Sequence, residues 1–358
     1  MNPKVVVNLE QLESNVRFLT DKMKQNNLSI TAVTKVHNAD PQVIKVFEQF
    51  PEIEYFGDSR IENLISFCTS SKKKVLIRIP MHSEVGDVVQ YADISFNSEL
   101  STIKLLDQEA KKQGKMHQVL LMVDLGDLRE GFFEEQELME VVAEVVKMEH
   151  IELAGLGVNL TCYGAIIPDE ENLGRLIDYK NTIEERFGLK LPMISGGNSS
   201  SLYLLDREDV SLPEGITNLR VGEAYLLAGE TAFSTPYEEM FQDVFTLRAE
   251  IVELKVKPSF PIGTIGVDAF GQSPVFEDQG KRLRGVLGIG RQDIPALDSI
   301  TPCDDKLEIM GASSDHLIVD FTDTDQAYKV GDEIVFKLDY GSLLASFTSK
   351  YVKKEYLK

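Results

Sequence analysis

The sequence of 358 residues has no Trp, only three Cys, and far fewer basic than acidic residues, with 37 Lys plus Arg against 58 Asp plus Glu. Its formal net charge of −21 repels phosphate backbones and anionic lipid head groups, so we expect neither nucleic acid nor a membrane as partner. No stretch approaches the roughly 18 apolar residues of a membrane span, and the N-terminus lacks the apolar core of a signal peptide. These absences predict a cytoplasmic location.

The cysteines exclude two further classes of protein. Cys68, Cys162 and Cys303 are far apart and odd in number, so neither a disulfide framework nor a metal site is expected. Reduced thiols fit the cytoplasm. Because 43% of the residues are hydrophobic, the chain can bury a sizeable core, and disorder is excluded.

Short β-rich runs recur through the first two-thirds of the chain. There are eight, at 30–34, 54–56, 75–79, 93–96, 119–123, 153–158, 192–195 and 218–221. Segments with helical spacing lie between them, such as 99–113 and 134–149. This alternation predicts an N-terminal (β/α)8 TIM barrel, with a doubly wound open sheet as the alternative.

After Thr235-Pro236 the pattern changes to strand-like runs punctuated by Pro and Gly, with almost no helical periodicity. We therefore expect an α/β protein with two domains, a barrel over 8–235 and a C-terminal all-β domain over 236–358. The N-terminal strand at 3–7 fits either domain.

Polar residues at the carboxyl ends of barrel strands are the ones to consider for an active site. Lys35 follows the first strand, where partial burial favours the uncharged amine that a nucleophile or base needs. A lysine that simply reaches solvent is the alternative. Arg129 follows the fifth strand and predicts either an anion ligand or a loop ion pair with Asp124 or Asp127.

The strongest local signal follows the seventh strand, in Ser195-Gly196-Gly197-Asn198-Ser199-Ser200-Ser201. Glycines let backbone amides approach a ligand, serines supply hydroxyls, and a helix that begins near Ser199 presents its positive end. Such barrels commonly hold phosphate at the loops after strands seven and eight. A lysine after strand one with a phosphate site there can hold a phosphorylated aldehyde as a Schiff base, which indicates pyridoxal 5'-phosphate.

With these residues in view, the chain resembles the alanine racemase-like pyridoxal-phosphate enzymes (fold type III), and within them the alanine/ornithine racemase group. The resemblance covers nearly the whole chain, with motifs in shared order at 32–35, 123–131, 155–164, 195–201, 219–224, 288–293, 311–316 and 339–341. It implies a homodimer in which the partner's C-terminal domain completes the active site.

The resemblance also implies roles for single residues. Lys35 forms the Schiff base and is one catalytic base, and Arg129 approaches the cofactor phenolate and the substrate carboxylate. Arg220 faces the pyridine nitrogen. Because a guanidinium only donates hydrogen bonds, it disfavours a protonated pyridinium, limits side reactions and fits racemisation.

Other implied contacts serve the cofactor and the substrate. The phosphate is expected at Ser199, Gly222, the amide of Glu223, and Tyr340. Asn159 and Asn198 are further expected cofactor contacts, and Ser314 and Asp315 are expected substrate contacts.

Racemisation needs two acid/base groups on opposite faces of the cofactor. In the family the second is typically a Tyr from the neighbouring subunit, but the corresponding stretch here, 261–270, contains none. Asp268 and His316 are the favoured substitutes, with Asp315 as a third choice. Each fits equally a turn residue or a substrate ligand.

The sequence therefore predicts a pyridoxal-phosphate-dependent racemase of a free amino acid, with ornithine first and lysine, alanine or serine as other substrates. One alternative is a non-catalytic protein of pyridoxal-phosphate homeostasis, although the β domain argues against it. The other is a basic amino-acid decarboxylase on the same fold, against which Arg220 argues because it replaces an acidic partner.

Overall fold

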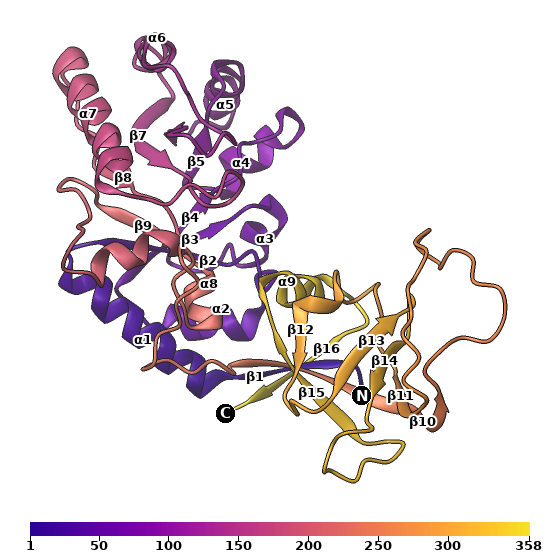
Figure 1. Ribbon diagram of the computed structural model, residues 1–358. Helices are drawn as coiled ribbons and strands as arrows, with labels where there is room; N and C mark the ends of the chain where they lie inside the picture. Colours follow the sequence, from indigo (N-terminus) through magenta and orange to yellow (C-terminus); the bar gives the residue numbers. More distant parts are fainter. The chain divides into compact units, whose positions relative to one another are not determined.

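The computed structural model describes residues 1–358, and the chain divides into two compact units. One comprises residues 10–242, and the other comprises residues 1–9 together with 243–358 (Figure 1). No helix in either unit has the length and apolar composition that crossing a bilayer requires.

The larger unit contains a closed barrel of eight parallel strands. The strands are β2 (Ser29–Val33), β3 (Ile53–Asp58), β4 (Lys73–Leu76), β5 (Ile94–Asn97), β6 (His117–Val123), β7 (Ile151–Val158), β8 (Met193–Ser195) and β9 (Asn218–Val221). Each overlaps one of the eight β-rich runs, although β4 begins two residues earlier and ends three residues earlier than its run, so the barrel prediction is confirmed. The open sheet is excluded because β2 pairs in parallel with β9 and closes the ring.

Helices surround these strands in the ribbon view (Figure 1). They are α1 (Leu9–Gln25), α2 (Pro41–Glu48), α3 (Ile61–Ser66), α4 (Val85–Tyr91), α5 (Leu100–Gln113), α6 (Glu135–Val145), α7 (Glu170–Phe187) and α8 (Glu223–Leu227), with 3-10 helices η1 (His82–Glu84) and η2 (Ser199–Leu205). The spacing of α1 buries Leu12, Val16 and Leu19 on one face. Helix α5 ends on Gly114, whose φ of 64° is the left-handed conformation that glycine adopts without strain.

Large apolar side chains fill the barrel interior, as expected for strands buried on both faces. One buried cluster comprises Val75, Ile94, Phe96, Leu120, Met122 and Met193. Gly155 allows the β7–β8 pair to approach, since a Cβ there would lie 1.7 Å from the carbonyl oxygen of Met193.

The smaller unit is built on one eight-stranded sheet. Its strands are β1 (Lys4–Asn8), β10 (Phe245–Pro258), β11 (Lys281–Leu287), β12 (Ile300–Pro302), β13 (Glu308–Ala312), β14 (Leu317–Asp320), β15 (Glu333–Leu338) and β16 (Lys353–Leu357), with η3 (Leu297–Ser299) and α9 (Tyr340–Thr348). The β-rich character is confirmed. Four elements were not anticipated, namely η3, the short β12, the final β16, and α9, which begins at a capping box at Asp339.

The N-terminal strand, which the sequence left open, lies in this second unit. Strand β1 pairs antiparallel with β10 and parallel with β16. Its three valines are fully or almost fully buried there.

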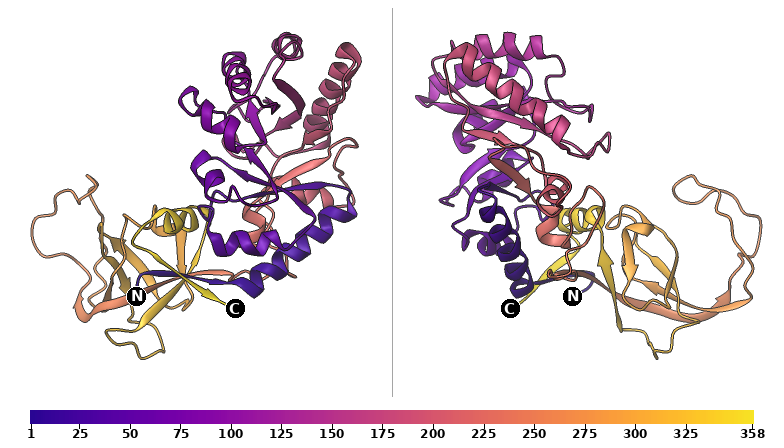
Figure 2. Two further views of the ribbon diagram at one scale, coloured as in Figure 1. Left: turned by 180° about the vertical axis from the view of Figure 1, so that it is seen from behind. Right: turned by 60° about the vertical axis from the view of Figure 1, so that its left-hand side comes forward.

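A long loop, residues 259–280, joins β10 to β11. It contains no regular secondary structure, and both views in Figure 2 show it extending away from the sheet of its own unit. Several of its apolar side chains are exposed, including Ile262 at 93% and Val267 at 70%.

Candidate active site

Lys35 lies just beyond β2, partly buried, at the carboxyl end of the barrel. The neighbouring Thr34 hydroxyl donates to Asp58 Oδ2 at 2.6 Å, so the backbone before Lys35 is tied to the end of β3. Asp58 is fully buried, and this burial raises the pKa of its carboxyl, although Thr34, the Arg60 amide, Asn63 and the charge of Lys35 act in the opposite direction.

The glycine- and serine-rich loop after β8 and the start of α8 come together. Ser199 Oγ accepts hydrogen bonds from the amides of Gly222 (3.4 Å) and Ala224 (3.2 Å). Asn198 caps η2 by accepting from the Ser200 amide at 2.8 Å. The helix expected near Ser199 is therefore present as a 3-10 helix, and the structure places Ser199 beside Gly222 and Glu223 as a cluster of hydroxyl and amide groups suited to an anion.

Arg220 lies on β9 and is 4% exposed. It donates to Ser195 Oγ at 2.7 Å and to the Val158 carbonyl at 2.8 Å, and its guanidinium lies 5.2 Å from the centroid of the Phe96 ring. Burial lowers the pKa of Arg220 to about 10, so the group is still charged at neutral pH.

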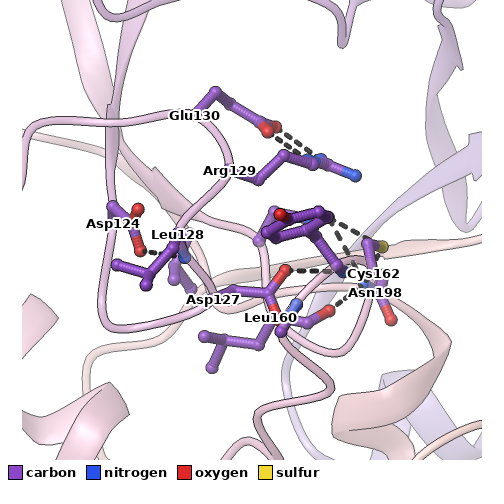
Figure 3. A network of polar contacts seen from close by, with 12 residues as sticks. Asp124, Asp127, Leu128, Arg129, Glu130, Leu160, Cys162 and Asn198 are labelled. Carbon is purple, nitrogen blue, oxygen red and sulfur yellow. Dashed lines mark hydrogen bonds and ion pairs between the residues drawn. The ribbon is translucent and has the colours of Figure 1, made fainter.

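Arg129 lies on the loop between β6 and α6, where its guanidinium pairs with Glu130, the Nη2 to Oε1 distance being 2.5 Å (Figure 3). The ion pairs considered with Asp124 or Asp127 were therefore wrong, because both carboxylates bind backbone amides instead. Burial opposes the charge on Arg129, but the hydrogen bond and charge of Glu130 leave the pKa of Arg129 raised above its usual value.

Two asparagines meet above the ends of β7 and β8. Asn198 Nδ2 donates to the Leu160 carbonyl at 3.0 Å (Figure 3) and lies 3.4 Å from Asn159 Oδ1. Asn159 is buried, and its Nδ2 has no hydrogen-bond partner within the chain. A buried amide donor without a partner is costly unless a ligand supplies the acceptor.

These residues fit pyridoxal phosphate. The hydroxyl and amide cluster at Ser199 suits the phosphate, Arg220 offers a buried cation, and the unpaired amide of Asn159 offers a hydrogen-bond donor. Lys35 carries an amine of the kind that can form a Schiff base with an aldehyde.

The remaining predicted residues belong to the smaller unit. Asp268 Oδ1 accepts from the amides of Phe270 (2.9 Å) and Gln272 (2.8 Å), and these bonds to backbone amides lower the pKa of its carboxyl. Asp315 accepts from Gln292 Nε2 at 2.8 Å and from the Ser314 hydroxyl at 2.7 Å. His316 is exposed beside them, and Tyr340 is the first residue of α9.

Sequence reasoning missed two buried carboxylates at this end of the barrel, Asp58 and Asp127. A signal for Asp58 was present, because it ends the second barrel strand, β3, in the same way that Lys35 follows the first. Asp127 had been considered only as an ion-pair partner of Arg129, whereas its three backbone contacts depend on a loop from another strand.

The closed barrel has a lysine after its first strand, a hydroxyl and amide cluster after its seventh and eighth strands, and a buried arginine on its eighth strand. These features together define a pyridoxal-phosphate enzyme of the barrel class. Residues 7–227 match the family model "Alanine racemase, N-terminal domain". The chain belongs to the alanine racemase family and is a pyridoxal-phosphate-dependent amino-acid racemase.

Full-length relatives agree with this assignment. The chain is 52% identical over 357 residues to the ornithine racemase of Acetoanaerobium sticklandii, with 100% of both chains covered. It is 34% identical over 356 residues to the lysine racemase of Thermotoga maritima, covering 99% of this chain and 98% of that protein. The crystal structure of alanine racemase from Bartonella henselae with covalently bound pyridoxal phosphate shares the fold, with a TM-score of 0.74, 16% identity and 100% of both chains covered.

Proposed function

We propose that this racemase interconverts L- and D-ornithine. The observation that carries the proposal is the 52% identity, over the full length of both chains, to a protein named ornithine racemase. The 34% identical relative is named for lysine, which is also a diamino acid, so a substrate with a distal amine is supported by both relatives.

Pyridoxal phosphate, when bound, withdraws electrons from the Cα of the amino acid and so lowers the barrier to removing its proton. The amine of Lys35 would hold the cofactor at its aldehyde and would move the Cα proton on one face. Arg129 would bind the substrate carboxylate. The phosphate would be held by Ser199, Gly222, Glu223 and Tyr340, and the ring would be oriented by Asn159 and Asn198.

Arg220 directs the outcome toward racemisation. Its buried guanidinium can only donate hydrogen bonds, and the lowered pKa of about 10 still leaves it charged at neutral pH. With the cofactor bound, a donor beside the ring nitrogen would disfavour protonation of that nitrogen and so would weaken electron withdrawal. Return of the proton to Cα is then favoured over slower side reactions.

The second acid/base group comes from the smaller unit, and two residues compete for the role. Asp268 accepts two backbone amides, and the lowered pKa of its carboxyl makes it a weak base. The weak basicity of Asp268 favours His316 as the second acid/base group, because histidine is the side chain that most often transfers protons in enzymes. Ser314 and Asp315, next to it in sequence, are proposed as substrate contacts.

A homodimer brings the second group to the site, and the loop at 259–280 supports this part of the proposal. Exposed apolar side chains along it include Ile262, Val267 and Val275. Such a patch on a loop is typical of an interface, and the occupant we propose is a second copy of this chain. The cofactor-binding domain is then 8–235 of one subunit, and 236–358 of the other completes the site. The cytoplasmic location stays a prediction, to be checked by cell fractionation.

The test is incubation of the purified protein, loaded with pyridoxal phosphate, with single enantiomers of ornithine, lysine, alanine and serine. We expect both enantiomers of ornithine to converge on an equal mixture in chiral chromatography, faster than the other three amino acids. Convergence on another amino acid would overturn the substrate. Release of carbon dioxide would indicate the decarboxylase, and cofactor binding without any turnover would indicate the homeostasis protein.

A further inference from the structure

The loop after β6, residues 124–131, is closed at its base by the backbone. The Asp124 amide donates to the Phe132 carbonyl at 3.0 Å, and the Phe132 amide donates to Met122 at 2.8 Å. Within the loop, Asp124 Oδ1 accepts from the amides of Gly126 (2.9 Å) and Leu128 (3.1 Å). Arg129 therefore projects from a loop whose backbone is already hydrogen-bonded.

Asp127, at the tip of this loop, reaches across to the loop after β7. Its Oδ2 accepts from the Tyr163 amide at 3.0 Å, and its Oδ1 accepts from the amides of Gly164 (3.0 Å) and Ile166 (3.3 Å) (Figure 3). The side chain is 1% exposed. Close approach is needed as well, because a Cβ on Gly164 would lie 2.8 Å from the Asp127 carbonyl oxygen.

Both loops hold non-glycine residues in the left-handed region of backbone conformation. Leu128 has a φ of 56°, Thr161 of 72° and Ala165 of 55°. Such residues persist only where surrounding contacts fix them, and Asp127 supplies contacts on both sides of Gly164. A further hydrogen bond connects the β7 loop to the loop after β8, because Asn198 Nδ2 donates to the Leu160 carbonyl at 3.0 Å.

We propose that Asp127 is a positioning residue, which locks the β6 and β7 loops into one frame and so fixes Arg129 for the substrate carboxylate. Preorganisation of this kind matters because a substrate ligand that is held in place binds and orients the substrate better than one that is displaced. The proposal rests on the proposed function for the identity of the substrate and for the role of Arg129 in binding its carboxylate. Asp127 is not proposed to contact the substrate, because its two carboxylate oxygens already accept three backbone amide hydrogens.

Asp127→Asn is the direct test, because it keeps the shape of the side chain and removes one acceptor. If the amide keeps its oxygen at Oδ1, its NH2 group faces the Tyr163 amide, donor against donor. If the amide is flipped, Gly164 and Ile166 lose their acceptor instead. We expect hydrogen exchange of the amides at 163, 164 and 166 to rise at least about tenfold, with a parallel rise at 126–131.

In the loaded enzyme we expect KM to rise about tenfold while kcat changes by less than about threefold, because a substrate contact is misplaced and the acid/base groups are not. Gly164→Ala, which pushes the loops apart without touching the carboxylate, should give the same pattern. The matched control is Asp107→Asn, since Asp107 also accepts a distant backbone amide, that of His150 at 3.0 Å, at the amino end of the barrel strands.

An unchanged KM in both variants, or faster exchange at 163–166 without any change at 126–131, would overturn the proposal. The exchange measurement needs no substrate. It therefore tests whether Asp127 holds the β6 and β7 loops together even if ornithine proves to be the wrong substrate.

Discussion

The loops at the carboxyl end of the barrel and the loop between β10 and β11 differ in how far they bury their polar side chains. Around Arg129 and Ser199, the buried carboxylates and hydroxyls accept backbone amides from within the same unit. The loop at 259–280 instead exposes apolar side chains, with Val275 at 97%. The barrel loops thus bury polar groups within their own unit, whereas the segment that carries Asp268 leaves several apolar side chains exposed.

The largest expected effect is that of a substitution at the carboxyl end of the barrel. Lys35→Ala removes the amine that binds the aldehyde and moves a proton, so we expect racemisation to fall by at least about 10⁴-fold. The absorbance band of the bound cofactor should disappear too. The control is Lys45→Ala on the exposed face of α2, which should keep both. A Lys35→Ala protein that retains the band would contradict the assignment of the lysine.

The next prediction tests whether His316 or Asp268, both in the smaller unit, is the second acid/base group. His316→Gln is expected to lower racemisation by about 10²- to 10⁴-fold, the usual contribution of an acid/base group. Exchange of the Cα proton with D2O should be lost for one ornithine enantiomer and retained for the other, because Lys35 still serves its own face. NMR of each enantiomer measures this.

Asp268→Asn is the comparison variant. Its amide oxygen can still accept the Phe270 and Gln272 amides, so the turn is retained. If Asp268→Asn rather than His316→Gln abolishes exchange for one enantiomer, the roles of the two residues are reversed.

A smaller effect concerns the barrel core. His117, whose Nε2 lies 2.8 Å from Ser95 Oγ, is buried, and this burial lowers its pKa from 6.5 to about 4. The unfolded chain therefore binds more protons between these values, so stability is present above pH 6.5 and is lost as the pH falls towards 4. The shift corresponds to about 3 kcal/mol.

His117→Gln should remove about this much of the difference between the free energies of unfolding at pH 7 and pH 4, measured by urea titration. The acidic residues titrate equally in both proteins, so the difference isolates the histidine. An identical pH dependence in the two proteins is the outcome that excludes a buried neutral His117.

The smallest effect tests the exposed loop. Val267→Asp places a charge in the proposed dimer interface, and we expect the dissociation constant of the dimer to rise about 30-fold, or about 2 kcal/mol. Sedimentation velocity over a range of concentrations measures it. Val146→Asp, at an exposed apolar position following α6, is the matched control. Equal effects in the two variants would count against this loop as the interface.

The sequence predicted the elements that have strong local patterns. The eight barrel strands were visible because strands buried on both faces are continuous apolar runs, and the turn-rich β pattern after residue 235 was equally plain. Helix α9 was missed because its signal is a single capping box within a β-rich region. Strand β1 could not be assigned, because three valines pack equally well in either unit until their pairing partners are known.

The candidate site likewise contains residues that local sequence patterns predicted and residues that they did not. Lys35 and Ser199 were predicted as site residues because strand ends define where barrel chemistry occurs, and Arg220 was predicted from the family resemblance. The partner of Arg129 was predicted wrongly, since several acids were within reach in sequence and only the fold of the loop selected Glu130. The role of Asp127 was invisible, because its amide partners lie 36 to 39 residues further along the chain.

The amino-acid order by itself determined the barrel, the β-rich remainder and the lysine at the end of the first strand, because apolar periodicity and strand-end position are local properties. Tertiary structure alone decided which carboxylate meets which amide and which sheet receives the first strand. These choices depend on hydrogen bonds between segments that only the closed barrel and the completed sheet bring together.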